Sequence, residues 1–179
     1  MANALTLDIS ATVLPDDISK AYTGLSATYA PADSSEGWYY KLTNITTSSA
    51  DIIASDEDSG NATYLQKGST RASGSMGVAT AFSPIDGSAD QIKFLFIRHL
   101  GTTDDGSTPT NESIYLGFGE AAVHNDATNI EIPTGQVWFG KFNTLTVDGL
   151  HAISGTAAGA GTGSGQIQAQ VFAILHDVA

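Results

Sequence analysis

The chain has four histidines, the side chains most often used for metal binding and for proton transfer near neutral pH. They are His99, His124, His151 and His176, and they fall on four separate segments. None lies in the H-x-H or H-E-x-x-H spacing that would indicate a cupin-like metal centre or a zinc protease. The sequence also has no cysteine, so thiolate metal sites, iron–sulfur clusters and cysteine nucleophiles are excluded. We therefore expect no metal site and no cofactor.

Three other motifs match a functional site only in part. Residues 56–61 begin like a calcium loop, but the glycine comes one place early and Lys67 stands where the twelfth-position glutamate belongs. Residues 117–122 fit G-x-G-x-x-A, yet a poor helix follows and no βαβ unit surrounds them. Asp104 and Asp105 are adjacent in a turn-forming segment, so they are poorly placed to flank a sugar from two sides. No G-x-S-x-G elbow is present. A catalytic triad can also form from residues far apart in the chain, which spacing does not test, but nothing in the sequence favours one. We therefore predict no catalytic residue and a protein that is not an enzyme.

The elements that would position any site are predicted to be short strands. Residues 5–13 alternate strictly between apolar and polar side chains, which indicates a half-buried strand. One short helical turn is expected at 16–22, and residues 155–165 are glycine-rich and predict a flexible loop. These patterns predict one all-β domain over residues 1–179, an antiparallel sandwich or barrel with at most one short helix. Further strands are expected at 38–45, 51–54, 62–67, 76–82, 91–100, 113–118, 129–132, 136–142 and 166–175.

Charge and hydropathy narrow the partners and the location. The 179 residues carry 19 acidic and 7 basic side chains, and a formal net charge of -12 would repel a phosphate backbone. No apolar stretch, residues 94–97 included, approaches the length of a membrane-spanning helix. No basic segment followed by an apolar run begins the chain. We expect no nucleic-acid binding, no membrane insertion and no secretion.

Three of the expected strands carry large apolar side chains on both faces. In residues 91–100, Phe94 and Phe96 alternate with Leu95 and Ile97, and 37–40 and 136–142 follow the same pattern. A two-sheet sandwich buries only one face of each sheet, so the other face needs cover from the chain's own loops or from another subunit. Each large side chain left in water would forgo about 1.5–3 kcal/mol, and contiguous exposed apolar patches usually mark an interface. We therefore expect a homo-oligomer, with these interface candidates: Trp38, Tyr39, Tyr40, Leu95, Ile97, Trp138 and Phe139.

Part of the chain is similar to a known class of protein. Residues 132–142 (IPTGQVWFGKF), then 151–154 (HAIS) and the last expected strand, resemble small β-rich virion proteins of tailed bacteriophages, most of all capsid decoration (cement) proteins. The richness in Ala, Gly, Ser and Thr and the acidic balance are similar as well. The resemblance implies a β-sandwich or jelly roll that assembles, commonly as a trimer, and clamps neighbouring major capsid protein subunits. It brings no catalytic residue.

The expected function is therefore structural. The protein would be made in the host cytoplasm and would bind the exterior of the capsid, adding buried contact area across subunit joints. A ligand that binds only the assembled state stabilises that state by mass action. Two alternatives are a phage tail or fibre module and a carbohydrate-binding β-sandwich, in which Trp38, Tyr39, Tyr40 or Trp138 would stack on sugar rings.

Overall fold

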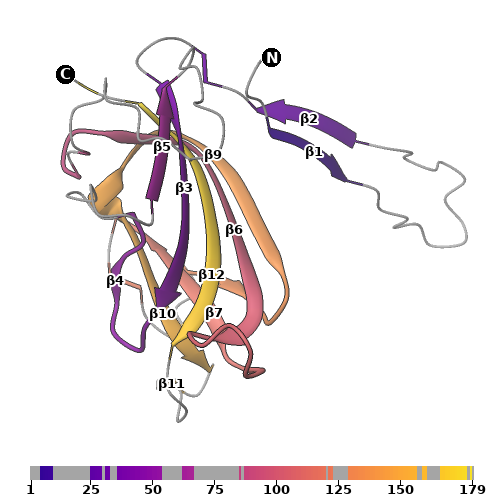
Figure 1. Ribbon diagram of the computed structural model, residues 1–179. Coiled ribbons are helices and arrows are strands. Elements are labelled where there is room, and N and C mark those ends of the chain that lie inside the picture. The colour runs from indigo at the N-terminus through magenta and orange to yellow at the C-terminus, as the bar shows by residue number, and fades with distance from the viewer. Residues whose placement is uncertain are drawn as a thin grey trace, which may run out of the picture.

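The computed structural model of the protein is built almost wholly from antiparallel strands (Figure 1). It describes residues 5–9, 25–29, 31–32, 36–53, 62–66, 85, 87–119, 121–122, 129–156, 159–160, 166–176 and 178. The single helical element in these residues is a 3₁₀ turn, η1 (Val147–Gly149). The predicted all-β sandwich is confirmed.

The larger sheet has five strands and lies in front in Figure 1. Neighbouring strands pair antiparallel throughout, and the longest strand, β6, lies next to the edge strand β9. The hydrogen-bonded order is β5 (Ala62–Gln66), β3 (Glu36–Ile45), β12 (Ile167–His176), β6 (Gln91–Thr103) and β9 (Val137–Thr146).

The second sheet packs behind the first and contains shorter strands. Its path is β11 (Gly159–Ala160), β10 (Leu150–Thr156), β7 (Ser113–Phe118) and β8 (Ile130–Ile132). A two-residue strand, β4 (Ala50–Asp51), also pairs with β10. Strands next to each other in the chain therefore often lie in different sheets: β3 precedes β4, β6 precedes β7, and β9 precedes β10.

A third, two-stranded sheet lies apart from the sandwich at the upper right of Figure 1. It is formed by β1 (Leu5–Ile9) and β2 (Leu25–Tyr29), which pair antiparallel. We call this pair the arm.

The core fills the space between the two large sheets. Alternate residues of β12 point into it, and Ile167, Val171 and Leu175 are fully buried. Strand β7 is buried on both faces for most of its length. One continuous cluster of buried apolar side chains joins residues from both sheets, so the two layers share a single core.

Most predicted strands are found, with shifted ends. The expected 113–118 matches β7, while β6, β9 and β12 extend beyond the expected 91–100, 136–142 and 166–175. The expected 51–54 shrinks to β4, and β2 was not predicted. Part of the expected glycine loop is ordered, because β10 runs to Thr156 and pairs with β11. Residues 10–13, the strand at 76–82 and the helical turn at 16–22 lie outside the described residues.

Candidate interaction surface

The outer face of the larger sheet carries apolar side chains in rows that run across the strands. Antiparallel partners share a face, so the register places Tyr40 of β3, Phe172 of β12, Phe96 of β6 and Phe139 of β9 in one row. The next row holds Leu42, Gln170, Arg98 and Val137. We call these eight residues the outer patch.

The rings of the outer patch contact one another but remain partly exposed. The Tyr40 and Phe172 ring centroids are 4.6 Å apart, and those of Phe96 and Phe172 are 5.8 Å apart with an edge-on geometry. All three side chains are half-buried. Leu42 and Val137 lie at opposite sides of the patch and are 42% and 47% exposed. Among the described residues, only three large apolar side chains are exposed, and these are two of them. The patch is thus an aromatic stripe flanked by exposed aliphatic side chains.

The second sheet differs, because its outer face is closed by the chain itself. Tyr115 of β7 and Ile153 of β10 are paired in register, and both are buried with Ala122 in a small cluster. The segment that carries Ala122 is held in place by a 2.8 Å hydrogen bond from its backbone N–H to the Ser49 hydroxyl. Only the larger sheet therefore presents an uncovered apolar outer face in the described part of the chain.

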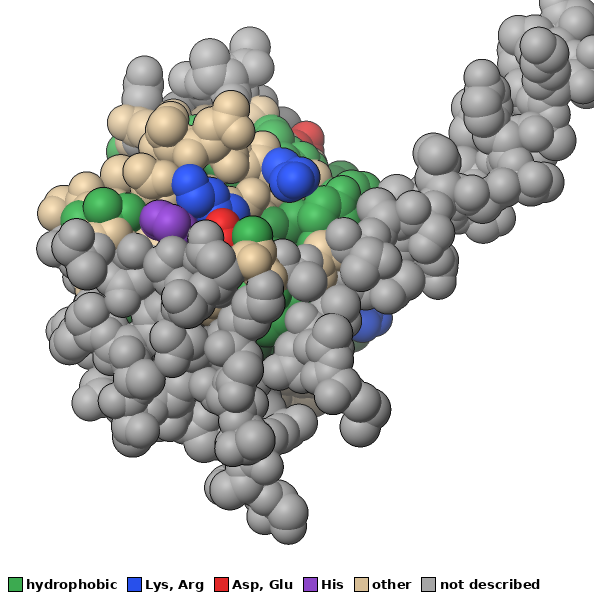
Figure 2. Space-filling model, turned by 90° about the horizontal axis from the view of Figure 1, so that it is seen from above, with side chains coloured by type: hydrophobic (Ala, Val, Ile, Leu, Met, Phe, Trp, Pro, Cys, Tyr) green, Lys and Arg blue, Asp and Glu red, His purple; other side chains and the backbone are tan. Residues whose placement is uncertain are grey.

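Towards the upper end of the larger sheet, the outer face is covered by Tyr29, the last residue of β2. We call this end of the arm its base. The Tyr29 ring stacks on Phe94 with centroids 4.2 Å apart, and Phe94 is only 1% exposed. The ammonium of Lys141 lies 6.0 Å from the centre of the Tyr29 ring, at the outer limit of a cation–π contact. Viewed from above, hydrophobic side chains at this end lie beside Lys and Arg side chains (Figure 2).

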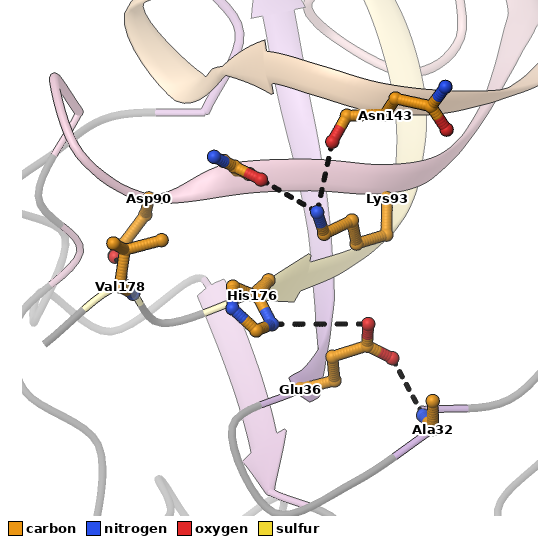
Figure 3. A network of polar contacts seen from close by, with 8 residues as sticks. Ala32, Glu36, Asp90, Lys93, Asn143, His176 and Val178 are labelled. Atoms are coloured by element: carbon orange, nitrogen blue, oxygen red, sulfur yellow. Dashed lines mark hydrogen bonds and ion pairs between the residues drawn. The ribbon is translucent and has the colours of Figure 1, made fainter.

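A polar network at the same end includes Ala32, which follows the arm in the chain (Figure 3). The backbone N–H of Ala32 donates to Glu36 Oε2 at 2.6 Å, and Glu36 Oε1 lies 4.0 Å from His176 Nδ1. Close by, the Lys93 ammonium donates to the Gln91 side chain and to the Asn143 carbonyl, at 2.6 and 3.0 Å. The chain next to the arm is therefore joined to β3 through Glu36, and Tyr29 at the end of β2 stacks on Phe94 of β6.

A shallow pocket of about 260 Å³ opens beside this network. Its walls include the Tyr29 and Phe94 rings, the Glu36 carboxylate and the two lysines, Lys93 and Lys141. Lys93 and Glu36 already have partners within the chain. Lys93 bonds within the sandwich and Glu36 bonds the segment next to the arm, so these two groups are engaged by the chain itself.

The structure divides the seven predicted interface residues between the two faces. Tyr39, Leu95 and Ile97 are 0% exposed and belong to the shared core, so their expected place on an uncovered face is wrong. The cause is that both faces of these strands are apolar, and alternation alone does not say which face turns inward. A register shift between Ile92 and Phe94 also moves Ile92 onto the core face with Leu95 and Ile97.

Trp138 likewise turns towards the core, at its rim. Its ring lies 5.6 Å from Phe118 and 6.0 Å from Phe142, and it packs against the shared core while staying half-buried. Gly140 makes room for it, because a Cβ there would lie 2.6 Å from the indole. Trp38, Tyr40 and Phe139 are the predicted residues that the structure places on the outer face.

Sequence reasoning missed the centre of the outer patch. Phe172 lies on the central strand β12, whose inward positions are apolar, whereas Gln168 and Gln170 precede it on the outward positions. A phenylalanine in phase with two glutamines, on a strand already buried on its other face, is the signal that could have identified it.

The histidines of the described chain serve the fold singly. His99 is fully buried on β6, where its Nδ1 accepts the Gly101 N–H at 2.9 Å and its Nε2 lies 2.9 Å from the Glu112 carbonyl. Burial lowers the pKa of His99, against a smaller opposite effect of the hydrogen bond to Glu112. His151 lies 2.9 Å from Asp51. No three metal-ligating side chains cluster among the residues that the structure describes, and the calcium-like residues 56–61 are not among these.

The adjacent aspartates Asp104 and Asp105 lie in an exposed loop. Asp105 accepts hydrogen bonds from the Ser107 and Thr108 backbone N–H groups, both at 2.7 Å, and from the hydroxyls of Thr103 and Thr108. These bonds, above all those from Thr108, hold the pKa of the Asp105 carboxyl well below its usual range. This carboxylate organises a turn, in agreement with the structural role inferred from its sequence context. In the GxGxxA segment, β7 ends at Phe118, and the next residue, Gly119, has a φ of 78° that suits a turn.

Comparison with protein-family models, with curated proteins and with solved structures finds no match for this chain. Among the described residues, no helix has the length and apolar character needed to cross a membrane.

Proposed function

We propose that this protein is a structural assembly module that binds other protein subunits through the outer face of its larger sheet. The observation that carries the proposal is the outer patch, an aromatic stripe left partly exposed on a sheet whose other face is a closed core. Aromatic residues are enriched at protein interfaces, and Lys, Glu and Asp are depleted there. The outer patch follows this composition, since its one charged member is Arg98.

The strand order supports a jelly roll as the finer description of the fold. One sheet runs β3-β12-β6-β9 and the other β4-β10-β7-β8, so eight strands divide four and four. Among these eight strands, the chain moves between the sheets at β3 to β4, β4 to β6, β6 to β7, β8 to β9, β9 to β10 and β10 to β12. In this reading β5 and β11 are additions at the edges. Double-sheet jelly rolls of eight strands occur in viral capsid proteins and in lectins.

Within this class we propose a capsid decoration protein that forms a homo-oligomer, with a trimer favoured, and binds the major capsid protein on the exterior of the shell. The support is the outer patch, the jelly-roll strand order and the resemblance of residues 132–175 to such proteins. Its effect would be to stabilise joints between capsid subunits, because it would bind the assembled shell and not the separate subunits.

Cryo-electron microscopy of virus particles purified from cells that produce the protein tests this proposal. We expect density for the protein over joints between major capsid subunits, and shells stripped of it should open at a lower temperature. Density in the tail would favour the tail or fibre alternative. Absence from the particles, or a shell that opens at an unchanged temperature without it, would contradict the decoration role.

A carbohydrate-binding module is the second candidate, and the ring stripe is the observation that favours it. Tyr40, Phe96 and Phe172 form a contiguous run of half-exposed rings, which could stack on the apolar faces of sugars. A glycan array with the full chain separates the two functions. Saturable binding that Tyr40→Ala removes would support the carbohydrate function.

A further inference from the structure

The arm alternates apolar and polar residues in register on its two strands, and it forms a sheet separate from the two large ones. The register pairs Leu5 with Tyr29, Leu7 with Ala27 and Ile9 with Leu25, and the alternate pairs are Thr6 with Thr28 and Asp8 with Ser26. Since antiparallel partners share a face, the pattern gives the ribbon one wholly apolar and one wholly polar set of positions. In Figure 1 the arm projects away from both large sheets.

Such a ribbon needs a partner. A lone two-stranded hairpin is at best marginally stable in water, and becomes stable when its apolar face packs against something else. The base of this arm is nevertheless held in place by the Tyr29–Phe94 stack and the Ala32–Glu36 hydrogen bond. The sandwich therefore presents the arm outwards from a fixed point.

From these observations we infer that the arm packs on the outer patch of a second copy of this chain. This inference rests on the proposed assembly function and names the occupant of the patch. Within one chain, Tyr29 of β2 already stacks on Phe94 of β6, so this sheet face accepts a residue of the arm through ring stacking. The outer patch lies on the same face, two residues further along β6 at Phe96 and four at Arg98.

Charge favours the same pairing. Residues 1–32 contain three aspartates and one lysine, which gives this N-terminal segment a formal net charge of -2. The outer face of the larger sheet carries two exposed cations, Arg98 and Lys141. Its carboxylate, Glu36, lies at the far end of the face, where it accepts a hydrogen bond from the Ala32 N–H and faces His176. In a chain with a net charge of -12, a face with two exposed cations is the complementary one for an acidic segment.

Exchange of an identical element between copies is a low-cost route to an oligomer. If each arm reaches the next copy head to tail, the contacts are heterologous, and a three-fold rotation between copies would close them into the trimer proposed above. The arm then joins copies, and the same contact covers the aromatic stripe.

Cysteine cross-linking between two differently substituted chains tests the inference cleanly, because the natural sequence has no cysteine. One full-length chain would carry Leu7→Cys, and the other Leu42→Cys or Val137→Cys at the exposed sides of the patch. After mixing, subunit exchange and mild oxidation, we expect a disulfide-linked heterodimer on a non-reducing gel. Thr6→Cys is the matched control on the polar positions of the ribbon, and with it the cross-link should be lost.

The oligomeric state of the same mixtures, measured by light scattering, separates the two proposals. An oligomer without the heterodisulfide, or one that cross-links equally through Thr6→Cys, would overturn the arm exchange and leave assembly standing. A monomer would overturn both. Rapid disulfide formation within single chains of a Leu7→Cys/Val137→Cys variant would show that the arm folds back on its own patch, and would also overturn the exchange.

Discussion

At the scale of single residues, His99 shows how a side chain that could do chemistry is used to hold the fold. Its Nδ1 accepts a backbone N–H from Gly101, so Nε2 carries the proton and donates to the Glu112 carbonyl. Protonation would place a second N–H against the Gly101 N–H and break that bond. A buried imidazole with two backbone partners is a structural lock and is not available as a general base.

This arrangement predicts a specific pH dependence of stability. Burial lowers the pKa of His99 in the folded protein below the ordinary 6.5, so the unfolded chain binds the proton more readily. The contribution of His99 to stability is therefore complete above pH 6.5 and is lost as the pH falls below that value towards its folded pKa. Urea unfolding between pH 7.5 and 5 should show this decline, and His99→Gln should flatten it. His151→Gln is the control. If the free energy of unfolding of His99→Gln fell with pH as much as that of the natural chain, the structural role assigned to His99 would be contradicted.

Asp105 makes a second prediction at this scale. Its carboxylate accepts four hydrogen bonds within the loop between Thr103 and Thr108, and these lower its pKa. In Asp105→Ala, amide hydrogen exchange at Ser107 and Thr108 should accelerate while amides of the buried strand β7 stay protected. The neighbouring Asp104→Ala serves as control. Unchanged exchange at Ser107 and Thr108 would show that the turn forms without the carboxylate.

At the scale of elements, the two faces of strand β6 lie in different environments, one in the core and one in the outer patch. Ile97 lies in the core at 0% exposure, whereas Phe96, its neighbour in the chain, lies in the outer patch. One face of the strand therefore stabilises the fold, and the other face belongs to the surface that we propose for association with other subunits.

Substitution of these neighbours should give opposite results. Ile97→Ala should lower the free energy of unfolding by about 2–5 kcal/mol, because it removes buried methyl groups from a packed core. Phe96→Ala should lower it less when measured in dilute solution, and should weaken self-association instead. Chemical denaturation with concentration-dependent light scattering measures both quantities. Equal losses of folding stability would place Phe96 in the core as well.

The same strand shows how much of the fold follows from sequence. Period-two alternation and turn residues predict most of the strands, since both are local properties. They do not predict which face of 91–100 turns inward, because Leu95, Phe96 and Ile97 are all apolar and a register shift near Lys93 changes the phase. The inward face is decided by pairing with β12 and β9, which are distant in the chain.

The sequence predicts that an uncovered apolar sheet face exists, but it does not predict all of the residues that form it. Apolar character on both faces indicates an uncovered sheet face, and Trp38, Tyr40 and Phe139 do lie on it. Phe172 and Leu42 join them only through long-range register, which no local pattern contains. The arm strand β2 was missed because Leu25, Ala27 and Tyr29 form a short run that only its pairing with β1 distinguishes.

At the scale of the whole molecule, the two outer faces of the sandwich are unequal. The smaller sheet is closed by Tyr115, Ala122 and Ile153, while the larger sheet leaves an aromatic stripe beside the base of the arm. Among the described residues, one apolar sheet face is thus left partly exposed, and contiguous exposed apolar patches usually mark an interface. Assembly is therefore the central claim, and the capsid role and the arm exchange both depend on it.

Sedimentation velocity at micromolar concentration tests that claim most directly. We predict a mass that is a multiple of the 18.5 kDa subunit, and a shift towards the monomer in Leu42→Gln/Val137→Gln. Val178→Gln is the matched control. Val178 is 43% exposed, which is close to the exposure of Leu42 and Val137, but it lies outside the outer patch. A single 18.5 kDa species for the natural chain, or equal dissociation in the control, would contradict the account.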